Sequence, residues 1–195
     1  MNKQFLFFIL LLVVILILIT GCTTENNNNN IKSYIEDKIG LKDYVLASEP
    51  VKKEGDDGYT DDYWHVKYKS IEFDVCNNYF YGREWTENQL EDDFNDKVLK
   101  YYYNQYLALS KSSFFIDEGH IECTYTDPNQ QIERKTFDDL VDFIKTIDFN
   151  EYPLHKILVK TKKLTSNGIS YDWWISIYEN GKIDSYEEFL KGYDE

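Results

Sequence analysis

The side chains best suited to chemistry in this chain are its three histidines, His65, His120 and His155. They lie far apart in the sequence, and none has a partner at the spacing of a metal-binding motif. The chain contains no HExxH, no CxxC and no glycine-rich phosphate loop. We therefore expect ordinary surface or strand histidines, no metal site and no cofactor. A catalytic site assembled in three dimensions stays open.

Carboxylates are abundant, and four of them crowd one segment: Asp56, Asp57, Asp61 and Asp62. Calcium is the cation that such a segment would hold, but the spacing is not that of an EF-hand, so a solvated acidic loop is the leading interpretation. The acids are too numerous for a pair such as Glu84 and Glu87 to stand out as the acid and nucleophile of a glycosidase. The sequence therefore names no catalytic residue, and binding is favoured over catalysis.

Aromatic side chains are the other unusual feature, with 17 tyrosines and four tryptophans. Trp173 and Trp174 are adjacent in a predicted strand, so they should point to opposite faces of a sheet. Three consecutive tyrosines, residues 101–103, should fan over about 200° of a helix, so at least one meets solvent or a second element. Such side chains either fill the core or offer rigid contact area to a ligand. The candidate ligand-binding residues are Trp173, Trp174 and Tyr103.

The N-terminus carries a basic residue, Lys3, followed by an uninterrupted apolar run over residues 5–19. This is the pattern of a secretory signal peptide. Fifteen residues rise about 22 Å as a helix, less than the roughly 30 Å of hydrocarbon that a stable span must cross. Residues 19–22, Ile-Thr-Gly-Cys, follow the run and resemble the lipobox of bacterial lipoproteins.

The resemblance implies that Cys22 receives a diacylglyceryl group and becomes the new N-terminus after cleavage. Two acyl chains give stable anchoring, so the chain should be held at the outer face of the cell membrane. An uncleaved N-terminal anchor is the alternative. We expect a signal peptide at 1–21, a lipidated cysteine with a disordered asparagine-rich tether at 22–30, and a folded extracytoplasmic domain at 31–195.

The charge balance limits the partners of this domain. Loss of Lys3 with the signal peptide leaves 20 of 21 basic side chains against 35 acidic ones, a net charge of −15. Nucleic acid and anionic lipid headgroups would be repelled. The only membrane attachment expected is the lipid on Cys22, and a protein partner with a basic surface is compatible with the charge.

Two further cysteines, Cys76 and Cys123, could pair in an exported protein. A disulfide closing a loop of about 48 residues would stabilise the domain by roughly 4 kcal/mol. The alternation of side chains argues against it, because Cys76 shares a strand face with acidic Asp74 whereas Cys123 shares one with Ile121. The disulfide is therefore a hypothesis that a distance between the two cysteines can decide.

Periodicity predicts an α+β fold with antiparallel hairpins and about four helices in a single domain. Predicted helices lie at 31–39, from a capping box at Thr86 and Gln89 onward, from a cap at Thr136 onward, and from a capping box at Ser185 and Glu188 onward. Predicted strands lie at 44–51, 64–68, 71–75, 120–125, 156–164 and 171–178, with a very short one at 182–183. Apolar residues alternate along 64–68 and, on the opposite parity, along 71–75, which predicts a bulge or a turn near 69–70. Asn-Gly pairs at 167–168 and 180–181 predict hairpin turns.

The leading hypothesis is a membrane-anchored cell-envelope lipoprotein that binds a protein or a wall-derived ligand. One alternative is an immunity or inhibitor protein whose acidity steers it to a basic toxin or enzyme. The other alternative, from a different class, is an envelope hydrolase. A histidine and a carboxylate within hydrogen-bond reach in a cleft would favour the enzyme, whereas an exposed aromatic patch ringed by acids would favour binding.

Overall fold

The structure is a computed structural model, and it describes residues 29–54, 60–78, 89–108, 114–123, 132–164, 168 and 170–192. The signal peptide, the lipobox with Cys22 and the tether up to residue 28 lie outside the described residues. So do Asp56, Asp57, Glu84, Trp85 and Glu87. Among the helices that are described, none is both long enough and apolar enough to cross a membrane.

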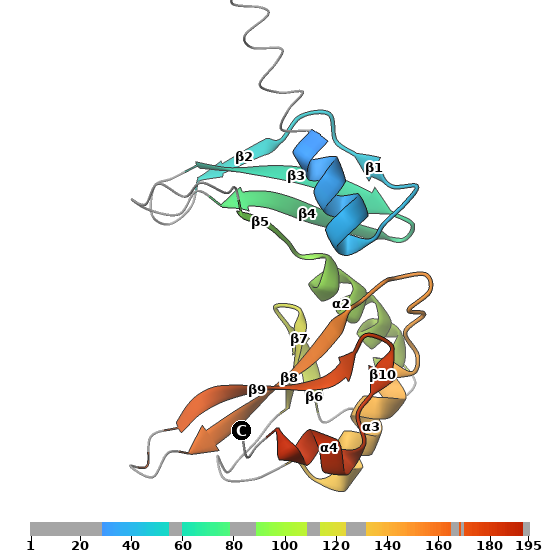
Figure 1. The fold of residues 1–195 in the computed structure, drawn as a ribbon, viewed down its shortest axis with the longest axis vertical. Helices are drawn as coiled ribbons and strands as arrows, with labels where there is room; N and C mark the ends of the chain where they lie inside the picture. Colours follow the sequence, from blue (N-terminus) through green and yellow to red (C-terminus); the bar gives the residue numbers. More distant parts are fainter. Residues whose placement is uncertain are drawn as a thin grey trace, which may run out of the picture.

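The described chain is built on two β-sheets, which lie one above the other in Figure 1. The first sheet has the strand order β1-β3-β4-β5, with β2 pairing along the same edge of β3 as β1. All its pairings are antiparallel. Its strands are β1 (Val45–Leu46), β2 (Val51–Glu54), β3 (Thr60–Tyr68), β4 (Ile71–Asn78) and β5 (Gln89–Asp92).

The second sheet has the order β10-β9-β8-β7-β6. Only the β7–β8 pairing is parallel, which requires a crossover between these strands. Helix α3 (Arg134–Ile144) lies on that crossover. The strands are β6 (Phe114–Asp117), β7 (His120–Cys123), β8 (Lys156–Leu164), β9 (Ser170–Glu179) and β10 (Lys182–Ile183).

Helices cover one side of each sheet and connect the two. Residues 29–33 are helical and continue into the π-helix η1 (Tyr34–Ile39), which packs on the first sheet. Helix α2 (Phe94–Leu107) contacts β4 of the first sheet and β6 and β7 of the second. Helix α4 (Tyr186–Lys191) lies against β9. A continuous set of buried apolar residues runs through both sheets, and the predicted α+β class is confirmed.

The regular alternation of side chains was predicted correctly in the strands that build this core. Trp64, Val66 and Tyr68 of β3 are buried, and so are Ile71 and Phe73 of β4, with the expected turn between the strands. The hairpin of β8 and β9 and the short return strand β10 are also confirmed. Helix α4 begins with the expected capping box of Ser185 and Glu188.

Three boundaries were predicted wrongly. Gln89 lies in β5, because residues 89–92 pair with β4, and the following helix begins only at Phe94. Helix α3 begins at Arg134, so Thr136 lies inside its first turn and does not cap it. The single strand expected at 44–51 is divided into β1 and β2. Sheet pairing overrode the local capping pattern in the first case.

Candidate functional site

The outer face of the second sheet is the side turned away from the helices and the buried core. Strand register places four of its side chains in one row across β6, β7, β8 and β9: Phe115, Glu122, Lys160 and Trp174. The two aromatic residues at the ends of this row are 42% and 45% exposed, and the two charged residues between them are half-buried. The row therefore presents an apolar contact surface at each end with charges in its middle.

A two-residue turn brings Asp117 and His120 together on this face. Glu118 and Gly119 both have positive φ, 42° and 79°, and the strands on either side pair Asp117 directly with His120. Positive φ at both central residues matches the right-handed twist of a hairpin. The backbone N–H of Gly119 donates to Oδ1 of Asp96 on α2 at 2.9 Å. The tip of the hairpin is thereby fixed to the helix that connects the sheets.

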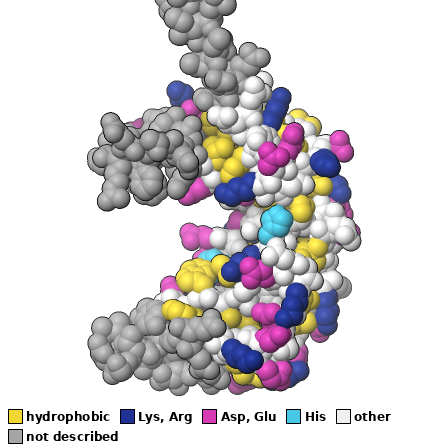
Figure 2. Space-filling view, viewed as in Figure 1, with side chains coloured by type: hydrophobic (Ala, Val, Ile, Leu, Met, Phe, Trp, Pro, Cys, Tyr) yellow, Lys and Arg dark blue, Asp and Glu magenta, His cyan; other side chains and the backbone are white. Residues whose placement is uncertain are grey.

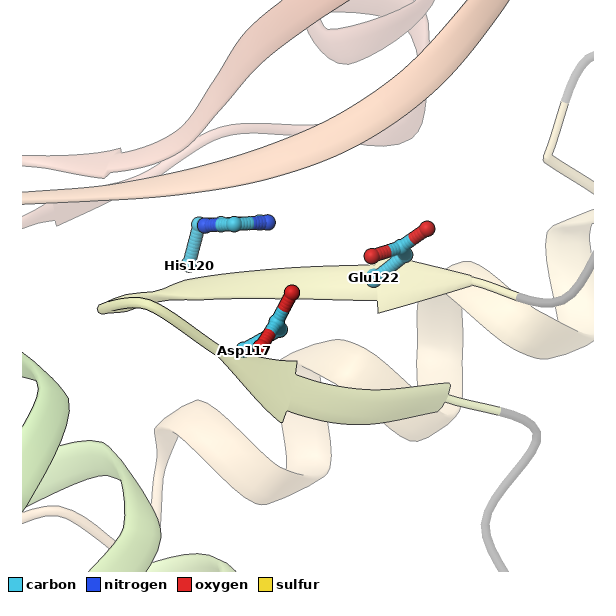
Figure 3. A group of neighbouring side chains, drawn as sticks. All are labelled: Asp117, His120 and Glu122. Carbon is cyan, nitrogen blue, oxygen red and sulfur yellow. The ribbon is translucent and has the colours of Figure 1, made fainter. Parts of the chain in front are cut away.

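Asp117, His120 and Glu122 project from the same side of the β6–β7 hairpin, as Figure 3 shows. One ligand atom of each residue lies within 4.8 Å of the other two. His120 is only 5% exposed, and its Nε2 has no hydrogen-bond partner among the described residues. Such an atom is uncommon because buried polar groups are nearly always paired. This cluster, which we call the hairpin triad, is the strongest candidate for a site.

Trp174 and Lys160 border the hairpin triad. The rings of His120 and Trp174 meet edge to face with their centroids 4.5 Å apart. Lys160 Nζ lies 3.6 Å from Glu122 and 3.4 Å from Asp172, and 5.7 Å from the centre of the Trp174 ring. Burial would lower the pKa of Lys160, but the two carboxylates outweigh it and raise this pKa above its usual value. The lysine is therefore charged and shared between two acids.

The other two candidate ligand-binding residues, Trp173 and Tyr103, make their contacts within the protein. Trp173 points to the opposite face from Trp174, as predicted, and its Nε1–H donates to the carbonyl of Gly192 at 2.7 Å. Tyr103 is half-buried, donates its hydroxyl to the carbonyl of Phe114 and packs its ring against Phe143. Of the three predicted residues, Trp174 alone is exposed, with 45% of its surface open to solvent.

The two cysteines of the domain lie in different sheets and are both buried thiols. Cys123 belongs to the buried apolar core, whereas Cys76 lies on the other side of β4 near Tyr63. The structure therefore has no disulfide between them. Burial raises the pKa of the Cys76 thiol to about 11, and nearby Asp61 and Glu91 act in the same direction. A thiol with so high a pKa is a poor nucleophile at neutral pH.

Among the described residues, neither of the other two histidines belongs to a group of three possible metal ligands. His155 is exposed. Of the four clustered aspartates, only Asp61 and Asp62 are described, and they are consecutive in β3, so their side chains leave opposite faces of the strand. His65 has carboxylate partners on the outer face of the first sheet, with Asp74 Oδ1 3.1 Å from its Nδ1 and Glu72 Oε2 3.7 Å from its Nε2.

A cavity of about 430 Å³ opens beside the hairpin tip, between the start of α2 and the turn of the hairpin. Its lining includes Asp93, Asp96, Lys100, Glu118 and Gly119. Figure 2 shows that the described surface is hollowed between the upper and the lower part of the molecule in this view. Hydrophobic, acidic and histidine side chains gather where the lower part borders the hollow. The cavity borders the hairpin turn, and its lining includes neither the side chains of the row nor those of the hairpin triad.

The hairpin triad was not predicted from the sequence, because its residues match no known metal-binding motif. The signal was the hexapeptide at 117–122, Asp-Glu-Gly-His-Ile-Glu. A two-residue turn at Glu118–Gly119 puts Asp117 opposite His120, and period-two alternation puts Glu122 on the same face as His120.

Comparisons with protein-family models, with curated proteins and with solved structures gave no match for this chain.

Proposed function

We propose that the chain is a cell-envelope lipoprotein that binds a wall-derived ligand on the outer face of its second sheet. The observation that carries the proposal is the row of Phe115, Glu122, Lys160 and Trp174, whose two ends are exposed aromatic rings. Aromatic rings offer flat apolar area to the faces of sugar rings, and the charged groups between them can bond to hydroxyls. Three strand spacings separate the row's ends, about 14 Å, which suits a ligand of two or three sugar units.

The proposed location rests on the N-terminal sequence. The apolar run at 5–19 and the lipobox-like residues at 19–22 support export, cleavage before Cys22 and lipid attachment there. An intact-mass measurement on the native protein tests this: we expect the loss of residues 1–21 and the gain of two or three acyl chains. A chain that begins at Met1 and carries no lipid would contradict the anchor.

Soluble glycan fragments released from purified cell wall are the probe for the ligand. We expect the full chain in detergent to bind them, and Trp174→Ala to weaken binding at least about tenfold because aromatic anchors carry much of the binding energy of an interface. Val45→Ala is the control, since Val45 is 67% exposed on the first sheet. Equal binding by wild type and Trp174→Ala, or no binding by the wild type, would overturn the wall-ligand proposal.

A basic protein is the second candidate ligand, because the whole chain carries a net charge of −14. Electrostatic attraction between exposed charges is screened beyond about 8 Å at physiological ionic strength. Capture of a basic protein should therefore weaken as salt rises, and binding that rests on Trp174 should not. A salt series with both probes separates the two candidates.

A further inference from the structure

We infer that the hairpin triad, Asp117, His120 and Glu122, binds one first-row transition-metal cation, for which Zn²⁺ is the appropriate probe. The ligand-binding role proposed above does not require a cation. The two proposals therefore stand on different observations and can fail separately.

The donor set fits zinc chemistry. Zn²⁺ accepts imidazole nitrogen at 2.0–2.1 Å and carboxylate oxygen at 2.0–2.2 Å, whereas Ca²⁺ and Mg²⁺ prefer oxygen ligands throughout. Tetrahedral donors at these distances lie about 3.4 Å from one another. The triad atoms lie within 4.8 Å, so closure needs movements of about 1 Å or a little more. Both carboxylates are half-buried and end in rotatable bonds, which makes such movements small rotamer adjustments.

The burial of His120 supplies an independent reason for a cation. The residue is only 5% exposed, one of its ring nitrogens points toward Glu122 in Figure 3, and Nε2 has no hydrogen-bond partner among the described residues. No hydrogen bond joins the ring to Asp117 or Glu122 within the described part of the chain. A coordinated metal would give this nitrogen a partner beside the two carboxylates, and neutral imidazole is a common metal ligand.

Lys160 acts as a competing cation at this site. Its ammonium lies 3.6 Å from Glu122 and 3.4 Å from Asp172, so it neutralises Glu122 but has a second acid to which it can turn. Metal binding replaces the contact between Lys160 and Glu122, and it leaves the contact with Asp172 in place. Removal of the lysine charge should therefore strengthen metal binding, which a purely structural role for the triad would not produce.

Three protein ligands leave a fourth coordination position. In zinc proteins an open position of this kind takes water or a group of the substrate. The triad projects from the outer face, on the side where the Trp174 ring lies against His120. A bound cation would give a wall-derived ligand a Lewis-acidic contact on that face. This consequence, unlike the metal site itself, rests on the proposed function.

A zinc titration of the full chain in detergent, purified without a polyhistidine tag, tests the inference. Competition with a chromogenic chelator gives the affinity, and Co²⁺ substitution gives visible absorption bands that report the ligand geometry. We expect one Zn²⁺ per chain, bands of a four- or five-coordinate nitrogen and oxygen site, and a rise in the melting temperature with zinc concentration. Ca²⁺ at the same concentration should not displace the zinc.

Variants assign the site. Asp117→Asn and His120→Asn should each weaken zinc binding at least about tenfold, and Lys160→Gln should strengthen it. The matched control is His65→Asn, which removes a histidine that also has two nearby carboxylates and should leave the affinity unchanged. Circular dichroism establishes that each variant is folded. Asp117→Asn keeps the shape of the side chain, so it tests the inference even if His120→Asn fails to fold.

The outcomes separate cleanly. One tight zinc ion that is lost in Asp117→Asn and retained in His65→Asn supports the site. The inference is overturned if the wild type binds no zinc, if Asp117→Asn binds as tightly as the wild type, or if His65→Asn abolishes binding.

Discussion

The outer faces of the two sheets carry the same kinds of residue, but the histidine on each face differs in its exposure and in its partners. On the first sheet, His65 lies between Asp74 and Glu72, and its side chain is 52% exposed. On the second sheet, His120 lies beside Asp117 and Glu122 but is 5% exposed and leaves Nε2 without a partner within the described chain. A histidine near two acids is therefore not by itself a sign of a functional site. The burial of the histidine and the pairing of its ring nitrogens distinguish the two cases.

Lysines explain part of the difference. On the first sheet, Lys53 reaches Asp74 at 3.2 Å and Lys67 reaches Glu72 at 3.2 Å, so each acid has its own cation. On the second sheet, Lys160 is shared between Glu122 and Asp172. The first face is thus a network of exposed ion pairs that contributes little to stability. The second face keeps an unpaired polar nitrogen in a dry position, which costs about 1 to 3 kcal/mol.

The largest predicted effect separates the inner and outer sides of the second sheet. Trp173→Ala should destabilise the domain by about 3 kcal/mol, because it removes buried ring area and the hydrogen bond to Gly192. Trp174→Ala should cost less than about 1 kcal/mol, since its ring is 45% exposed. Urea unfolding of the two variants measures both values, and similar losses would contradict the assignment of Trp174 to a ligand face.

Replacing the histidine by leucine should change the free energy of unfolding with opposite signs on the two faces. His120→Leu should raise the free energy of unfolding of the metal-free protein by about 1 to 2 kcal/mol, because an apolar side chain of similar size removes an unpaired buried nitrogen. His65→Leu should lower it by less than about 1 kcal/mol by breaking exposed pairs. Urea unfolding in chelator tests the contrast. A strong loss of stability in His120→Leu would mean that the ring is satisfied in the native state.

Acid sensitivity tests the ion pairs of Asp74 on the first face. Burial would raise the pKa of Asp74, but hydrogen bonds with His65 and Lys53 outweigh it and lower this pKa below its usual value. A carboxyl whose folded pKa is depressed contributes stability that is present above the unfolded pKa and is lost as pH falls through the folded value. Asp74→Asn should therefore flatten the loss of stability below about pH 4, as measured by melting temperature against pH. An unchanged slope would show that Asp74 is not held by these cations.

The smallest effect concerns the thiols. Burial raises the pKa of Cys76 to about 11 and Cys123 lies in the core, so neither should react with iodoacetamide at pH 7.5 in the native protein. In denaturant without reductant both cysteines should be alkylated, and mass spectrometry gives the number of alkyl groups added. A product that gains no alkyl group at residues 76 and 123 would instead reveal a disulfide between them.

Much of the local structure could be predicted from the sequence. The hairpin of β8 and β9 followed from alternating side chains around Asn167–Gly168, and the opposed orientation of Trp173 and Trp174 followed from the strand period alone. The capping box at Ser185 predicted the start of α4. These features depend on residues that are close together in the chain, so their signals are local.

The division into two sheets and the candidate site depended on distant contacts. The parallel pairing of Ile121 with Val159 requires a crossover connection between their strands, which no local sequence pattern predicts. Trp174 reaches His120 only because β8 lies between their strands. The turn at Glu118–Gly119 lacks the usual asparagine and is held from outside by Asp96. The triad could have been suspected from its hexapeptide, but the burial of His120 could not.

The most direct measurement of the central claim is anomalous X-ray scattering at the zinc edge from crystals of the folded chain grown with Zn²⁺. The claim is that the outer face of the second sheet is built for a group from outside the chain, whereas the first face is satisfied by its own lysines. We predict one strong peak bounded by Asp117, His120 and Glu122 and none at His65. A peak at His65, or a hairpin triad without zinc in which His120 Nε2 is hydrogen-bonded within the chain, would contradict it.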